Sequence, residues 1–97
     1  MKRVNLGDGR WFDSHKATDY KDDTEWDGHN HISVATGDQW VRATLWHTAS
    51  GAWVLETDSP YETKYDYPVA ESDAFRWLID NGHSDAVPKT FLKEMEV

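Results

Sequence analysis

The sequence predicts an α+β fold, a meandering antiparallel sheet of about four to six strands with one or two C-terminal helices packed on it. Two observations carry this prediction. Before residue 70, short β-rich runs alternate with Gly- and Pro-containing turns; after it, apolar residues follow the helical period. The 97 residues suffice for one modest core, so residues 1–97 are expected to form a single domain.

The composition supports a folded domain with an aromatic core. Hydrophobic residues make up only 38% of the chain, but six Trp, four Tyr and three Phe are among them. Each aromatic side chain buries roughly 150–250 Å², so a few of them can form a small core. The chain has no Cys, which excludes disulfides, thiolate metal ligands and a thiol nucleophile.

The N-terminal third contains both strand and loop signals. Residues 3–12 predict two short strands around the turn Gly7–Asp8–Gly9. Residues 13–27 hold six acids and two lysines, and we expect an exposed loop with room for one helical turn. Residues 30–36, "NHISVAT", are expected to form a strand.

Residues 39–59, "QWVRATLWHTASGAWVLETDS", predict a β-hairpin. Two β-rich runs flank "TASG", which supplies Gly where a turn needs a left-handed residue. Strand alternation places Trp46 and Leu45 on opposite faces. With a four-residue turn, Trp53 and Leu55 would join the Trp46 face, and Val54 would join the Leu45 face.

After a further strand at about 61–69, the apolar period becomes helical. Ala74, Trp77 and Leu78 are spaced i, i+3 and i+4 and predict an amphipathic helix over about 71–81, with Gly82 as its stop.

Helix boundaries follow from the capping residues. Ser72 or Asp73 is the expected N-cap of the first helix. Pro88 suits the first turn of a final short helix over about 88–95. The side chains expected to pack from that helix are Phe91, Leu92 and Met95.

The charge balance restricts the partners. The chain has 18 Asp and Glu, 10 Lys and Arg, and a formal net charge of −8. Direct binding to nucleic acid or to an anionic membrane surface is therefore not expected, because both need clustered cations. A basic protein surface, including the nucleic-acid groove of another protein, is the favoured partner. No apolar run resembles a signal peptide or reaches the ~20 residues of a membrane span, so we expect a cytoplasmic protein.

The acids are densest between residues 19 and 27, where a tryptophan lies among them. Carboxylates around an aromatic anchor suit recognition of a basic partner, although the same charge also keeps small domains soluble. The predicted partner-binding residues are Asp19, Asp22, Asp23, Glu25, Trp26 and Asp27.

A metal site is the main alternative. His29 and His31 would point the same way in a strand, and His47 or an acid of residues 13–27 would be a third ligand. The adjacent letters "HNH" resemble only the name of a nuclease motif, whose residues are spread over a hairpin and a helix. The spacing of Asp23, Glu25 and Asp27 matches half of a calcium loop, but Val34 stands where the bidentate Glu belongs. We expect no cofactor.

A carbohydrate-binding module is the second alternative. Trp40 and Trp53, at a strand end and beside a turn, are the tryptophans expected to reach solvent and stack on sugars. A free apolar sheet face would equally allow a homodimer.

The chain shows no nucleophile elbow, triad or phosphate loop, so the sequence favours a non-enzymatic binding protein. "WDGHNHISVATGDQW", "TASGAWVLETDS" and "AFRWLIDNGH" resemble a loose group of small bacterial, plasmid and phage proteins with no assigned activity, over about residues 6 to 83. The resemblance implies a prokaryotic or mobile-element origin. Small acidic proteins of that setting include nucleic-acid mimics that act as inhibitors, of the anti-CRISPR, anti-restriction or antitoxin type.

Overall fold

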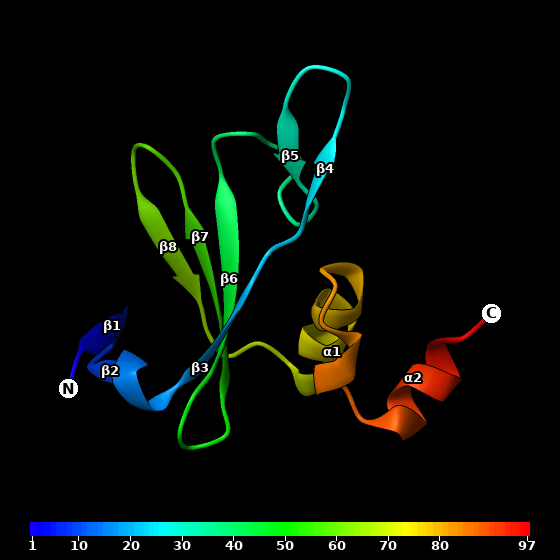
Figure 1. Ribbon diagram of the computed structural model, residues 1–97. Coiled ribbons are helices and arrows are strands. Elements are labelled where there is room, and N and C mark those ends of the chain that lie inside the picture. The colour runs from blue at the N-terminus through cyan, green and yellow to red at the C-terminus, as the bar shows by residue number, and fades with distance from the viewer.

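The computed structural model describes all 97 residues and confirms the α+β fold, with the two α-helices at the C-terminus (Figure 1). Three antiparallel sheets are present instead of one. The strands are β1 (Arg3–Gly7), β2 (Arg10–Asp13), β3 (Thr18–Lys21), β4 (Thr24–Trp26), β5 (His31–Ser33), β6 (Arg42–His47), β7 (Trp53–Asp58) and β8 (Thr63–Asp66). The helices are α1 (Glu71–Asp80), α2 (Lys89–Met95) and the 3₁₀ turns η1 (Ser14–Lys16) and η2 (Ser84–Ala86).

The central sheet has the strand order β3-β6-β7-β8, and β1-β2 and β4-β5 each form a separate two-stranded sheet. Figure 1 shows the β4-β5 hairpin projecting past one end of the central sheet, with the helices beside the sheet and β1-β2 away from them. The radius of gyration is 14.2 Å, above the ~12.5 Å typical of a compact chain of this length. The projecting hairpin accounts for part of this extension.

The predicted β6-β7 hairpin is present, but its register differs by one residue from our expectation. Leu45 pairs with Leu55 and Trp46 with Val54, so Trp53 and Leu55 share the Leu45 face. The assignment of Trp53 and Leu55 to the Trp46 face was therefore wrong. The reason is that His47 pairs with Trp53, which leaves a five-residue turn over 48–52. One added turn residue reverses the face of every residue on the return strand.

The main core lies between the Leu45 face of the sheet and the helices. It comprises Leu45, Trp53, Ala74, Leu78 and Val87, all at most 6% exposed. Phe75 of α1 and Phe91 of α2 pack against this core, and their rings meet each other at 5.2 Å. The two predicted helices thus cover the same sheet face.

The opposite face is covered at one end by the β1-β2 hairpin. Phe12 is buried there and its ring lies 5.5 Å from that of Trp46, beside fully buried Val54. The tip of this hairpin is a two-residue turn in which Asp8 and Gly9 have φ of 55° and 76°. Positive φ at both residues is typical of a type I′ turn, whose twist matches that of the flanking strands. The turn predicted at Gly7–Asp8–Gly9 is therefore present.

Helix α1 agrees closely with its prediction, apart from its first cap. Ala70 is the N-cap and no side chain caps it, so the expected cap at Ser72 or Asp73 was wrong. At the other end the His83 N–H donates to the Leu78 carbonyl (2.8 Å), with Gly82 at φ 83°. This is a Schellman ending, which needs a left-handed residue where Gly82 stands.

Helix α2 starts one residue after the predicted position, with Pro88 as its N-cap. Phe91 and Leu92 pack against the core as expected, whereas Met95 remains 41% exposed.

The helical turn expected within residues 13–27 is present as η1, but the rest of the expected loop was wrong, since it contains β3 and β4. Strand β3 pairs with β6 at the sheet edge, where polar side chains face water on one side. That pairing partner is more than twenty residues away, so the local polar composition did not reveal it. The predicted strand over 30–36 is shorter than expected and ends at Ser33.

Candidate functional site

The projecting part of the molecule is residues 22–41, which we call the acidic arm. It consists of β4, β5 and the turn that leads into β6 (Figure 1). The arm contains five acids and no Lys or Arg. Four of these acids are exposed and form no ion pair: Asp23, Glu25, Asp27 and Asp38.

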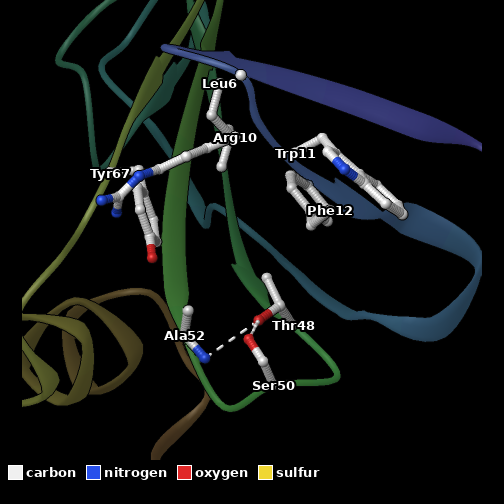
Figure 2. Close-up of a pocket in the computed structure, with 9 residues that line it drawn as sticks. Leu6, Arg10, Trp11, Phe12, Thr48, Ser50, Ala52 and Tyr67 are labelled. Carbon is white, nitrogen blue, oxygen red and sulfur yellow. Dashed lines mark hydrogen bonds between the residues drawn. The ribbon is translucent and has the colours of Figure 1, made fainter.

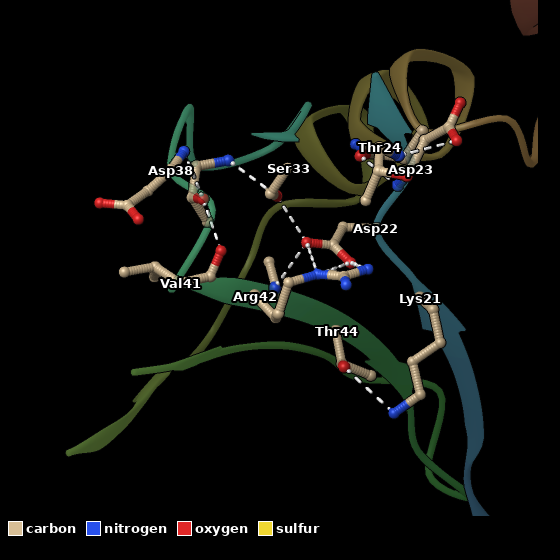
Figure 3. A network of polar contacts seen from close by, with 12 residues as sticks. Lys21, Asp22, Asp23, Thr24, Ser33, Asp38, Val41, Arg42 and Thr44 are labelled. Carbon is tan, nitrogen blue, oxygen red and sulfur yellow. Dashed lines mark hydrogen bonds and ion pairs between the residues drawn. The ribbon is translucent and has the colours of Figure 1, made fainter. Parts of the chain in front are cut away.

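The fifth acid, Asp22, is buried at the base of the arm, which corrects its predicted place on the exposed surface. Its side chain is 1% exposed and forms an ion pair with Arg42 at 2.6 Å (Figure 3). The same carboxylate accepts hydrogen bonds from the Ser33 hydroxyl and from the Ala43 N–H. Asp22 therefore joins the end of β3, the end of β5 and the start of β6, and a partner cannot reach it.

The hydrogen bonds to Asp22 also fix its ionisation. Burial alone would raise the pKa of Asp22, but the hydrogen bonds from Arg42, Ser33 and Ala43 and the positive charge of Arg42 outweigh it. The net result is a pKa below the ordinary value of 3.8. The ion pair correspondingly raises the pKa of Arg42.

The tip of the arm is a tight turn organised by Asp27. Its Oδ1 accepts the N–H groups of His29 (2.8 Å) and Asn30 (2.7 Å). These two bonds, from Asn30 first and His29 second, hold the pKa of Asp27 below its ordinary value. Gly28 has φ 105°, a conformation that favours glycine. Asp27 stays exposed and charged, but its first role in this structure is to shape the turn.

The segment between β5 and β6 is held by its own polar side chains. Ser33 Oγ accepts the Thr36 N–H (3.2 Å), and the Thr36 hydroxyl donates to the Val41 carbonyl (2.7 Å). Asp38 Oδ1 accepts the Trp40 N–H (2.7 Å), which positions the Trp40 backbone. The arm is thus ordered by local hydrogen bonds even though it buries little apolar surface.

Two tryptophans project from the arm. Trp26 is 60% exposed and its ring meets the edge of the His31 ring at 5.2 Å. Trp40 is 68% exposed. Both rings are therefore accessible to a partner.

Five of the six predicted partner-binding residues are on the arm, but Asp22 is buried, so the exposed ones are Asp23, Glu25, Trp26 and Asp27. Asp19 lies apart on β3, next to Lys21 with 3.5 Å between the charged groups. Sequence reasoning missed Asp38, and it considered Trp40 only as a sugar platform. The one signal that could have identified Asp22 is Arg42, the only Lys or Arg between residues 22 and 63.

The structure does not assemble the alternative metal site. His29 is in the turn at the tip of the arm, while His31 is on β5 against Trp26. His47 lies on β6 of the central sheet, stacked on Trp53 with 3.9 Å between ring centroids. No group of three His, Asp or Glu is placed to hold a metal ion.

The expected pair of exposed tryptophans is only half right. Trp40 is exposed, but Trp53 is 6% exposed and belongs to the core. A sugar platform built from Trp40 and Trp53 is therefore ruled out by the burial of Trp53.

Comparison of the chain with protein-family models, curated proteins and solved structures found no match. None of the helices has the length and apolar character needed to cross a membrane.

Proposed function

We propose that the protein is a non-enzymatic binding protein that inhibits or regulates a basic, nucleic-acid-handling complex of a bacterium or mobile element. The acidic arm would occupy the partner's nucleic-acid groove as a nucleic-acid mimic, in the manner of anti-CRISPR, anti-restriction or antitoxin inhibitors. The observation that carries the proposal is the arm itself, which combines four exposed, unpaired carboxylates with Trp26 and Trp40 and lacks any cation.

Charge and aromatic surface would have different roles in this binding. Unpaired carboxylates raise the rate of encounter with a basic surface, by roughly 10- to 1,000-fold in steered associations. Trp side chains at the centre of an interface often contribute the largest share of the binding free energy. The hydrogen bonds of Asp27, Ser33 and Thr36 hold the arm in one conformation, which lowers the entropy lost on binding.

The test is capture of partners from a bacterial lysate on the immobilised protein, with two double variants in parallel. The arm variant is Glu25→Lys with Trp26→Ala. The control variant, Glu94→Lys with Tyr61→Ala, changes an acid and an aromatic side chain in the same way at exposed positions outside the arm. Equal thermal stability of the three proteins is checked first.

We expect wild type and control to retain the same basic nucleic-acid-binding protein, released by high salt or by competing duplex DNA. The arm variant should retain at least tenfold less, because an anchoring Trp and a steering charge are both lost. Equal retention by the arm variant would overturn the proposal, as would failure of wild type to retain any basic protein at low salt.

A further inference from the structure

The N-terminal segment, residues 1–17, has the opposite charge balance from the arm. It holds four of the ten Lys and Arg residues but only two of the 18 acids. All four ion pairs of the protein lie outside this segment, so its four cationic side chains have no carboxylate partner. They are Lys2, Arg3, Arg10 and Lys16.

A hollow of about 260 Å³ opens between β2 and the 48–52 turn, and Arg10 lies at its rim (Figure 2). Its apolar lining includes the rings of Phe12 and Tyr67, whereas the ring of Trp11, which also borders the hollow, points away from Arg10 and Tyr67 (Figure 2). The hydroxyls of Thr48 and Ser50 line the side formed by the turn. Two aromatic rings, two hydroxyls and one unpaired cation therefore border a single small cavity.

The position of Arg10 leaves its hydrogen-bonding edge free. The guanidinium carbon lies 5.7 Å from the centroid of the Tyr67 ring, so the ring supports one face of the group. The nearest acid along β2, Asp13, accepts the N–H groups of Lys2 and His15 with its Oδ1. Neither Asp13 nor Asp8, the acid of the adjoining turn, forms an ion pair with Arg10. A guanidinium presents a planar fork that fits carboxylate and phosphate groups.

We propose that this hollow binds a small anionic aromatic ligand, a flat ring that bears a carboxylate or a phosphate. The ring would pack between Phe12 and Tyr67, and the acid would pair with Arg10. The volume is just below the roughly 300–1,000 Å³ of pockets for drug-sized ligands, which suits one ring with one acidic group. The site is separate from the acidic arm, so its occupancy does not depend on the function proposed above.

Four probes separate the contributions of ring and charge in NMR titrations of the intact ¹⁵N-labelled protein. Benzoate and phenyl phosphate carry both features, acetate carries only the charge, and benzyl alcohol only the ring. We expect benzoate or phenyl phosphate to give saturable shifts at the Trp11 indole N–H and at the amides of residues 48–52. Acetate and benzyl alcohol should bind at least tenfold more weakly.

The variant Arg10→Gln should weaken binding of the anionic rings at least tenfold. Arg3→Gln is the matched control, because Arg3 is on the same hairpin over Trp11 but does not line the hollow. Equal weakening by the two variants would overturn the site. Dissociation constants above about 10 mM for both anionic rings, or equal affinity for acetate, would also overturn it.

Discussion

Two hairpins are attached to the same central sheet by different kinds of interaction. The β1-β2 hairpin is held by apolar packing, where Phe12 lies against Trp46, the cross-strand partner of Val54. The acidic arm is held by one buried carboxylate, that of Asp22, which joins Arg42, Ser33 and the Ala43 N–H. Apolar contacts are insensitive to pH and tolerate small changes of orientation. Charged hydrogen bonds are directional and depend on ionisation.

The two kinds of attachment match the different surfaces of the acidic arm and the β1-β2 hairpin. The arm has no large apolar base, because its exposed surface is mostly polar and Trp26, Trp40 and Val34 are its exposed large apolar side chains. A polar anchor fixes its orientation with few residues. The N-terminal hairpin instead exposes its cations, while the buried Phe12 attaches it to the central sheet.

The largest stability loss is expected from the apolar attachment. Phe12→Ala should lower the free energy of unfolding by about 3 kcal/mol, at the low end for a buried Phe because a hollow already adjoins the site. Urea unfolding measures this change. Trp11→Ala, the exposed neighbour on the same strand, should cost less than about 1 kcal/mol. Similar losses for both variants would show that the hairpin is not held mainly by Phe12.

A smaller but substantial loss is expected from the polar attachment. Asp22→Ala should cost about 2 kcal/mol, because it leaves the Ser33 hydroxyl and the Ala43 N–H without their buried acceptor. Arg42 is half exposed and can regain water, which keeps the loss below that of a fully buried ion pair. Asp19→Ala, an acid exposed on β3, serves as the control and should change stability by no more than about 0.5 kcal/mol. An equal effect of the two substitutions would contradict the anchoring role of Asp22.

The smallest expected effect is a pH dependence of stability that is present for the polar attachment and absent for the apolar one. The pKa of Asp22 is lowered in the folded state, so its contribution is complete above the ordinary value of 3.8 and is lost as the pH falls through the lowered value. Protonated Asp resembles Asn, and the stability gap between wild type and Asp22→Asn should therefore narrow below about pH 3.8. The gap between wild type and Phe12→Ala should stay constant over the same range. Unfolding curves from about pH 6 to pH 2 provide the comparison, and a constant gap for Asp22→Asn would contradict the ion pair.

Sequence patterns predicted the elements that depend only on residues close together in the chain. The helix over 71–81 follows from the spacing of Ala74, Trp77 and Leu78, and its end follows from Gly82. Strand β3 was not predictable in this way, because its evidence is its pairing with β6. The face of Trp53 depended on one extra turn residue, which composition does not specify.

The candidate site was predicted only in part, because the sequence does not show which groups meet in three dimensions. A run of acids located the arm, but neighbouring carboxylates have the same chemistry and only their three-dimensional partners distinguish them. Asp22 and Asp23 are adjacent, yet one is buried beside Arg42 and the other is exposed. Burial of Trp53 likewise depends on packing against α1, where its ring meets that of Phe75, and the strand pattern does not contain this information.

The C-terminal end of α1 also holds the start of the arm. The Asp23 N–H donates to Asn81 Oδ1 (3.1 Å), and His83 Nε2 lies 2.7 Å from the Lys21 carbonyl. The ribosome therefore synthesises the hydrogen-bond partners of residues 21–23 about sixty residues after these residues themselves. At a synthesis rate of roughly 5–20 residues per second, this delay is about 3 to 12 s. During translation, residues 21–23 therefore emerge before Asn81 and His83 and without these bonds.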